Sequence, residues 1–455
     1  MNKKWFKVFI LLVLPLFFGI KINAQNGSNN DCFVPNQIII GLNSAANLPA
    51  VAGQYGLNPT PTGQVGTPPI YLLQIANGQT PDQIINATTG DVRITFAEPN
   101  RCMIYPETLG QSWAVGQSWA VGGSVKGYQR NWFAKTIRLA EAHQMPGGST
   151  GAGVTVAVLD TGIDLTHPAF AGKLVPGFDF VDNDNNPSEV GVLRQNSAYG
   201  HGTHVAGIIA MVAPDAKIMP LRILNANGEG ESWRITAALI YAANNNANVV
   251  NLSFGYREKS NLLKKLIDCA DDGMDDDDGT VFPQIGEKRF IVVAASGNSG
   301  NRRDTLNHLL RIYPAAERVH GMLSVGASNR LDRLTDFSSF SDLANQTPSE
   351  YKWVDVIAPG ENIVSAIPGG RYGVWSGTSM SAPIVSGLAA LVKAKFPALT
   401  PEQIADQVKD TGVQRRYFDN YRGFEIDTDR VDALCAVMNR DPCLIPVTVF
   451  PSPLP

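Results

Sequence analysis

The sequence predicts an α/β fold, a doubly wound and mostly parallel sheet with helices on both faces, preceded by a smaller α+β domain. From about residue 129 onward, nearly continuous apolar runs alternate with stretches of helical periodicity, a pattern typical of parallel strands buried on both faces. Residues 25–105 contain shorter strands and helices between turn formers. A chain of 455 residues is long enough for both domains.

The first 24 residues have the pattern of a secretory signal peptide. Lysines precede the apolar run "VFILLVLPLFFGI", and the small residue Ala24 follows it. Because a bilayer span needs about 20 apolar residues, this run is too short. We therefore expect a secreted or otherwise extracytoplasmic protein with no stable membrane span. An uncleaved anchor is the alternative, because Ile22 is large for a position before a cleavage site.

The smaller domain is expected to have β-α-β-β-α-β order. Residues 37–42 ("QIIIGL"), 70–75 ("IYLLQI") and 92–97 ("VRITFA") have strand patterns, and a fourth strand is expected near residues 60–65. Helices are expected at 48–57 and 80–90, the second opening on Thr80-Pro81 as an N-cap followed by proline.

Export permits disulfides, and the chain has five cysteines. Cys32 precedes the first strand and Cys102 follows the last, and these strands are neighbours in the expected fold. We therefore predict a Cys32–Cys102 disulfide. Cys435 and Cys443 are spaced to close a short loop, which would leave Cys269 free.

Residues 106–128 are predicted to be an exposed linker that is accessible to cleavage. The hexapeptide "QSWAVG" occurs twice in tandem there and "GGS" follows, which is too short for a solenoid repeat.

The larger domain, 129–440, contains the apolar runs "GVTVAVLD", "KIMPLRIL", "NVVNLSF" and "RFIVVAASGN", which we interpret as parallel strands. Helices are expected at 201–210, 233–246 and 379–396. Residues 268–279, rich in aspartate, are interpreted as a solvated loop rather than a calcium loop, because Met274 stands where the first liganding Asp is needed. Residues 441–455 form a short tail.

The composition favours a soluble globular protein and disfavours nucleic acid as a partner. Apolar residues make up 44% of the chain and charged residues 17%, with a net charge of −4 and no basic half.

Three motifs place polar side chains where catalytic groups gather. Asp160 ends a buried strand, whereas Asp164 follows a turn and is the expected bystander. Ser379 opens a helix, where a serine is ordinarily an N-cap but could also react if a base activated it. Asn298 ends another strand, where it either forms a turn or donates to an oxyanion.

The stretch "GHGTHVAG" places His201 and His204 three residues apart. They could be a metal pair, an acid–base pair, or one reactive and one structural histidine. The spacing lacks the neighbouring Glu and the four-residue separation of the common zinc-protease motif.

These motifs together resemble the subtilisin-like serine proteases. The segments "AVLDTGID", "GHGTHVAG", "AASGNSG" and "SGTSMSAP" stand in that family's order Asp, His, Asn, Ser, and residues 36–100 resemble its propeptide, a chaperone and inhibitor. The resemblance implies a triad of Asp160, His201 and Ser379, with Asn298 in the oxyanion hole and His204 as a structural residue. It also implies a self-processing zymogen that acts on protein or peptide substrates and is inhibited by its own propeptide.

The resemblance further implies which residues bind substrate. The segments Ser253-Phe254-Gly255 and Ala295-Ser296-Gly297 would pair with an extended peptide and wall the main specificity pocket. Ile312, before "YPA", would stand at the pocket floor where many relatives have glycine. With Phe254 adding bulk to a wall, we expect small or medium apolar side chains before the scissile bond.

We expect no required cofactor and no metal site. Only Met211 separates "GIIA" from "VAPDA", so the calcium loop found in many relatives is missing, and "DFVDNDNNP" is the remaining weak cation candidate. Two other functions were weighed. A catalytically dead scaffold disagrees with the complete motif set, and an ester or lipid hydrolase would commonly have G-x-S-x-G and the order Ser, Asp, His.

Overall fold

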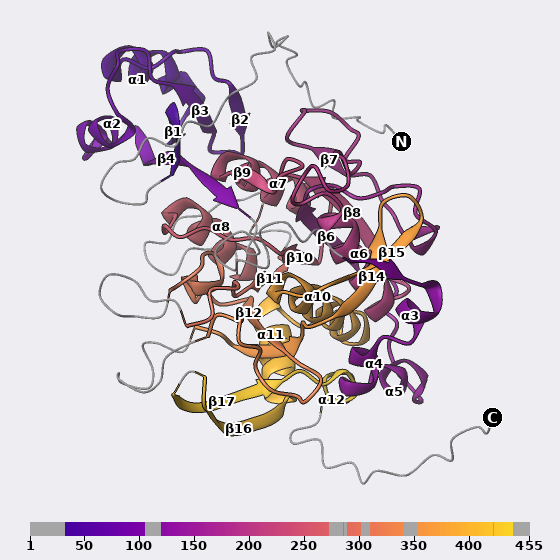
Figure 1. Ribbon diagram of the computed structural model, residues 1–455. Coiled ribbons are helices and arrows are strands. Elements are labelled where there is room, and N and C mark those ends of the chain that lie inside the picture. Colours follow the sequence, from indigo (N-terminus) through magenta and orange to yellow (C-terminus); the bar gives the residue numbers. More distant parts are fainter. Residues whose placement is uncertain are drawn as a thin grey trace, which may run out of the picture.

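The computed structural model describes residues 32–104, 120–272, 285, 289–301, 310–340, 353–421 and 423–439 (Figure 1). The expected signal peptide, residues 106–119 of the expected linker, the C-terminal tail and the aspartates at 275–278 lie outside these ranges. Within them, no helix is both long enough and apolar enough to cross a bilayer.

The N-terminal domain has the expected β-α-β-β-α-β order, including the strand near residues 60–65. Its sheet has the strand order β2-β3-β1-β4, and β1 pairs antiparallel with β4. The capping box at Thr80 and the proline that follows it begin the second helix as expected. The elements are β1 (Phe33–Leu42), α1 (Leu48–Tyr55), β2 (Gly63–Val65), β3 (Ile70–Gln74), α2 (Pro81–Thr88) and β4 (Ile94–Ile104).

Strand β1 is buried on both faces. Ile38 and Ile40 point into the domain's own core, beneath α1 and α2. Ile39 points the other way and belongs to the apolar cluster of the larger domain. Because side chains alternate along a strand, one face of the sheet packs into the core of the N-terminal domain and the other packs against the larger domain.

The predicted disulfide between Cys32 and Cys102 is confirmed, with the two Cα atoms 5.2 Å apart. Cys269 is buried and is not in a disulfide, as expected. Cys435 is also in a disulfide, and its expected partner, Cys443, lies outside the described residues.

The larger domain is built on the expected doubly wound sheet. Its strand order is β16-β17-β13-β12-β11-β10-β6-β8-β7, with parallel pairing throughout except between β16 and β17. The strands are β6 (Thr155–Asp160), β7 (Phe178–Asp179), β8 (Lys217–Arg222), β10 (Val249–Leu252), β11 (Ile291–Ala295), β12 (Met322–Ser328), β13 (Val356–Pro359), β16 (Val413–Asp419) and β17 (Phe424–Arg430).

Helices cover both faces of this sheet. On β6, Val156 and Val158 pack into one cluster with α6 and α10, whereas Ala157 and Leu159 pack into another with α7 and α8. The N-terminal domain lies on the α7 and α8 side (Figure 1). The helices are α3 (Val125–Gln129), α4 (Trp132–Thr136), α5 (Leu139–Gln144), α6 (His201–Val212), α7 (Ser232–Asn244), α8 (Asn261–Asp272), α10 (Thr378–Lys395), α11 (Pro401–Asp410) and α12 (Ala433–Met438).

Two sequence interpretations need correction. The last part of the expected linker is ordered structure: β5 (Ala120–Gly123) pairs with β15 (Arg371–Trp375), which also pairs with β14 (Ile363–Ile367). The start of the expected aspartate-rich loop is the end of α8, where Asp268 and Asp271 are buried. Asp271 accepts a hydrogen bond from the Glu402 N–H at 2.7 Å and so caps α11.

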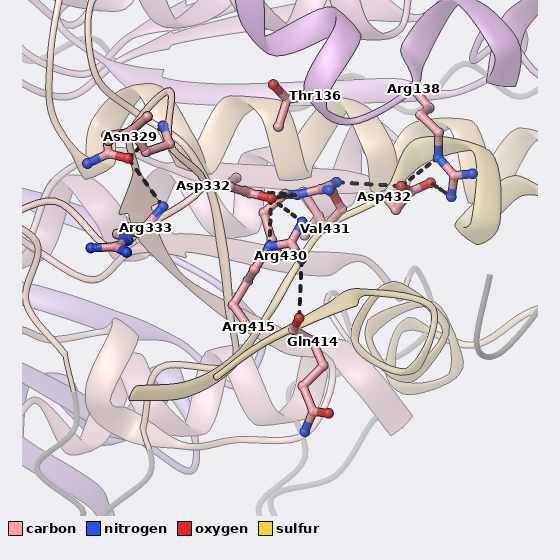
Figure 2. Close-up of polar contacts among 12 residues, drawn as sticks. Thr136, Arg138, Asn329, Asp332, Arg333, Gln414, Arg415, Arg430, Val431 and Asp432 are labelled. Carbon is pink, nitrogen blue, oxygen red and sulfur yellow. Dashed lines mark hydrogen bonds and ion pairs between the residues drawn. The ribbon is translucent and has the colours of Figure 1, made fainter. Parts of the chain in front are cut away.

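Ion pairs join the C-terminal hairpin of β16 and β17 to other segments of the larger domain (Figure 2). Asp332, which follows β12, accepts from Arg415 at 2.6 Å and from Arg430 at 3.1 Å. Arg138, at the start of α5, donates to Asp432 at 2.8 Å. The Arg138–Asp432 contact joins the beginning of the larger domain to its last described part (Figure 2).

Candidate active site

Asp160 and His201 meet at the carboxyl edge of the sheet. Strand β6 ends at Asp160 and α6 begins at His201, and Asp160 Oδ1 lies 2.7 Å from His201 Nδ1. The same oxygen accepts the Thr161 N–H at 2.8 Å. Both side chains are fully buried, so the carboxylate fixes the ring without competition from water.

The start of α6 approaches β6 so closely that only glycine fits next to His201. A Cβ at Gly202 would lie 2.1 Å from the Gly162 carbonyl oxygen. Gly200, the N-cap, has φ of 93°, a region that favours glycine. The glycines of "GHGTH" therefore bring the imidazole to the carboxylate.

Ser379 is the second residue of α10 and is buried. Its hydroxyl donates to the Ser253 carbonyl oxygen at 3.1 Å. Because Ser379 is in the first turn, its backbone N–H has no acceptor within the helix. The N–H and the positive end of the helix dipole are therefore available to a negative oxygen.

Asn298 lies beside the start of α10. Its Oδ1 accepts the Thr378 N–H at 2.9 Å and the Thr378 hydroxyl at 3.1 Å. Among the described residues, its buried Nδ2 has no hydrogen-bond partner. A buried amide donor without an acceptor is costly, which suggests a ligand oxygen as its partner.

His204 packs in the buried structure around His201. It is fully buried, and its Nε2 lies 3.1 Å from the Ile363 carbonyl oxygen. Burial, with the nearby charge of His201, lowers the pKa of His204 to about 3, so the ring is neutral. Trp375, which sequence reasoning missed, stands edge-on to both rings, with centroids 5.3 Å from His201 and 5.8 Å from His204.

Comparison with known proteins identifies the family of this chain. Residues 151–425 match the subtilase family model. A thermophilic serine proteinase of Bacillus sp. (strain AK1) is 30% identical over 416 residues, which cover 88% of each chain. The chain belongs to the subtilase family. It is therefore a peptidase of the serine type, as the motifs indicated.

Other subtilases are similar over shorter stretches. Subtilisin NAT of Bacillus subtilis subsp. natto is 35% identical over 273 residues, which are 58% of this chain and 61% of that relative. The crystal structure of fervidolysin from Fervidobacterium pennivorans, described as a keratinolytic enzyme related to subtilisin, has 24% identity and a TM-score of 0.64. The match covers 90% of this chain and 62% of that one, and it supports the fold. Residues 20–100 match the fervidolysin N-terminal prodomain, so the smaller domain of this subtilase is a prodomain.

Ile312 fills the space between the two segments expected to bind substrate. A Cβ at Gly255 would lie 2.2 Å from Ile312 Cγ2, and a Cβ at Gly297 would lie 2.6 Å from Ile312 Cγ1. Ile312 is fully buried between these glycines. The subtilase therefore has a branched side chain where the sequence analysis expected the pocket floor.

The remaining expected binding residues lie around this position. Ser253 donates its hydroxyl to the Ser379 carbonyl oxygen at 3.1 Å. Ala295 ends β11, and Ser296 donates its hydroxyl to the Ser339 carbonyl oxygen at 3.1 Å. Phe254 is buried in the apolar cluster that also includes Met103 of the prodomain.

The prodomain strand β4 pairs with an edge that sequence analysis missed. Residues 102–104 pair antiparallel with β9 (Glu229–Glu231) of the larger domain. Earlier in β4, Asn100 Oδ1 accepts the Trp233 N–H at 3.0 Å, and Glu98 accepts the Ser260 hydroxyl at 2.7 Å. The only sequence signal was the short "GEGES" segment after a strand, which has no strand periodicity of its own.

The segment at 179–187, the expected weak cation site, forms a turn whose aspartates pair with Arg222. Asp179 accepts the Val181 N–H at 2.8 Å, and it forms an ion pair with buried Arg222 at 2.6 Å. Asp182 pairs with the same guanidinium. Among the described residues, no group of three or more His, Cys, Asp or Glu side chains is arranged to hold a metal ion.

Proposed function

We propose that this subtilase is a secreted serine endopeptidase, made as a self-processing zymogen, with a triad of Asp160, His201 and Ser379. The observation that supports it best is the buried Asp160–His201 contact of 2.7 Å, together with the position of Ser379 in the first turn of α10. The complete motif set and the family relationship argue against a dead scaffold.

The acyl-transfer chemistry assigns one task to each group. His201 Nε2 takes the proton of the Ser379 hydroxyl as Oγ attacks the carbonyl carbon of the scissile bond. Asp160, whose carboxylate lies against Nδ1 of His201, fixes the tautomer of the imidazole ring and stabilises the imidazolium. His201 then gives the proton to the leaving amine, and an acyl-enzyme remains. Water, deprotonated by His201, releases the second product.

The tetrahedral intermediate carries a negative oxygen that needs donors. The Nδ2 of Asn298 and the backbone N–H of Ser379 are assigned to it. The hydrogen bonds from Thr378 to Oδ1 turn the amide so that Nδ2 is left for the substrate.

The prodomain is assigned as the intramolecular inhibitor. Its strand β4 already occupies the β9 edge, where an extended substrate would add a strand. Residues 105–119 join the end of β4 to β5, which pairs with β15 just before Ser376. The connection between these fixed ends is our expected site of self-cleavage.

Specificity for small or medium apolar residues before the scissile bond is proposed from Ile312. Its side chain occupies the space between Gly255 and Gly297. Profiling with a peptide library should show preference for Ala, Val or Leu, and Ile312→Gly should gain activity on Phe and Tyr. A wild-type preference for Phe or Tyr would contradict this assignment.

No cofactor is assigned a step in this scheme, and calcium independence is tested by assay in EDTA. Extracytoplasmic location is proposed from the N-terminal apolar run and from the Cys32–Cys102 disulfide, which needs an oxidising compartment.

The deciding experiment compares the wild type with Ser379→Ala by intact mass and N-terminal sequencing of the secreted protein. We expect the wild type to begin between residues 106 and 129, and the variant to keep its prodomain. Turnover of the variant should fall on the order of a millionfold, the loss known for a subtilisin serine. If neither protein is shortened, self-processing is wrong, and if both are shortened, another protease makes the cut. Turnover then decides whether the triad is active.

A further inference from the structure

The helix that begins with His201 has no side-chain N-cap of its own, because its N-cap is Gly200. Its first N–H groups are bound from outside the helix. The His201 N–H donates to the Ala198 carbonyl oxygen at 2.9 Å, and the Gly202 N–H donates to Thr161 Oγ1 at 3.0 Å. The third, the Thr203 N–H, donates to Glu189 Oε2 at 3.2 Å.

Glu189 is fixed on both sides of this contact. The same carboxylate oxygen accepts the Thr203 hydroxyl at 2.9 Å. The Glu189 backbone N–H donates to the Ile163 carbonyl oxygen at 3.1 Å, just beyond the Asp160 turn. Thr203 Oγ1 in turn accepts the Asp164 N–H at 2.9 Å. Glu189 therefore ties the start of α6 to the segment that follows Asp160.

We propose that Glu189 is a positioning residue that holds His201 in register with Asp160 by capping the start of α6. This inference rests on the proposed function, because it concerns the base of that triad. Glu189 itself does not touch the His201 ring or the reacting atoms. It acts through Thr203, two residues along the same helix, and a carboxylate at that place also complements the helix dipole.

The charge of Glu189 provides a readout that a purely structural cap would not give. Burial raises the pKa of Glu189 to about 7, and the negative charge of Asp160 adds to the rise. Tyr199 is the other titratable group that faces it, and Arg371 and Asp164 act on Tyr199 in turn. When ionised, Glu189 adds a second negative charge near Asp160. This added charge favours the imidazolium form of His201.

The test uses mature wild-type enzyme, Glu189→Ala and Glu189→Gln, with kcat and KM measured on a chromogenic peptide across pH. Ala removes the acceptor, so kcat should fall by about 10- to 100-fold, the effect of a misplaced base, with KM within about twofold. Gln keeps an acceptor oxygen for Thr203 and should recover most of kcat. Glu189 ionises as the pH rises through about 7 and Gln does not, so the upper part of the acidic limb of the kcat/KM profile, where the wild type carries the charge, should move to lower pH.

Asp164→Asn is the matched control, since it removes a half-exposed carboxylate near the same helix start without touching the cap. It should leave kcat and the acidic limb unchanged. The inference is overturned if Glu189→Ala keeps kcat within about twofold, or if Asp164→Asn reproduces its loss. It is also overturned if Gln leaves the limb where it was, a reading available even if Ala does not fold. Failure of the wild type to cleave any peptide would instead refute the proposed function.

Discussion

Helix α6 and helices α7 and α8 begin in different ways. The first N–H groups of α6 are bound by residues of its own domain, including Thr161 and Glu189. The starts of α7 and α8 are bound in part by the prodomain: Asn100 accepts the Trp233 N–H, and Glu98 accepts the Leu262 N–H at 3.2 Å. In α8 the next N–H, that of Leu263, donates to Ser260 Oγ of the same domain at 3.1 Å. The first helix begins at His201, the proposed base, and the other two bind the prodomain that we propose is removed on maturation.

If the prodomain is the inhibitor that we propose, the difference explains how the larger domain can bind it without changing the start of α6. A cap within the domain keeps His201 in place whether or not the prodomain is bound. A cap borrowed from the prodomain is lost when the prodomain leaves, and water must then bind the exposed N–H groups. The prodomain therefore gains affinity from helix starts that catalysis does not use.

The start of helix α10 is bound in a third way. Asn298 accepts the Thr378 N–H through Oδ1, and among the described residues its Nδ2 has no hydrogen-bond partner. Replacing Asn298 with Ala should lower kcat by about 100- to 1,000-fold, since the developing oxyanion loses a donor. The loss of the bond to Thr378 should lower stability by only about 1 kcal/mol. Kinetics on a peptide substrate and thermal unfolding measure the two effects separately.

Thr400→Ala is the matched control for this variant. Thr400 caps α11 through the Gln403 N–H and has no place in the active site. It should show the stability loss of a cap without a change in kcat. If Asn298→Ala loses less than about tenfold in kcat, Asn298 is an ordinary cap and its unused donor has no catalytic role.

The sequence predicted the parts of this arrangement that have local patterns. The strand that ends at Asp160, the helix that begins at His201 and the helix that contains Ser379 in its first turn were predicted from apolar runs and periodicity, and the structure confirms them. The prodomain order was predicted in the same way, and Cys32 could be paired with Cys102 because that order made their strands neighbours.

The contacts that the sequence did not predict join distant segments. The pairing of β4 with β9 and that of β5 with β15 join segments more than 100 residues apart, and neither short strand alternates clearly. The aspartates at the end of α8 were predicted to be in a solvated loop because they are charged. The structure places Asp268 and Asp271 in the helix, where they are buried. Glu189 gave no signal, since its role depends on where the chain folds back.

A second prediction concerns the borrowed cap of α8. Replacing Glu98 with Ala in the prodomain should raise its inhibition constant by about 10- to 100-fold, because the Leu262 N–H and the Ser260 hydroxyl would be buried without an acceptor. The measurement is inhibition of the mature enzyme by added prodomain. Thr80→Ala is the control, because this cap of α2 lies within the prodomain and away from the interface. Equal effects of the two variants would mean that prodomain folding, not the borrowed cap, sets the affinity.

The smallest expected effect is a pH dependence of prodomain binding. Burial raises the pKa of Glu98 above its ordinary value in the complex, whereas free prodomain exposes this carboxyl to water. Binding therefore takes up a proton. Affinity should be greatest below that ordinary value and should fall as pH rises toward the raised pKa of the bound state.

Burial is the largest effect on the pKa of Glu98, and the hydrogen bonds from Ser260 and Leu262 are the largest effects that oppose it. Burial raises the pKa of Glu317 to about 7, and the charge of Glu98 adds to the rise while Lys259 and Lys264 oppose it. Arg101 opposes the rise at Glu98, and Tyr256 stays neutral because burial raises its pKa further. The inhibition constant should rise several-fold between pH 5 and pH 8, and Glu98→Gln should flatten that slope because it keeps the acceptor and cannot ionise. A slope of opposite sign, or an unchanged slope in the Gln variant, would show that the borrowed cap is not where the proton binds.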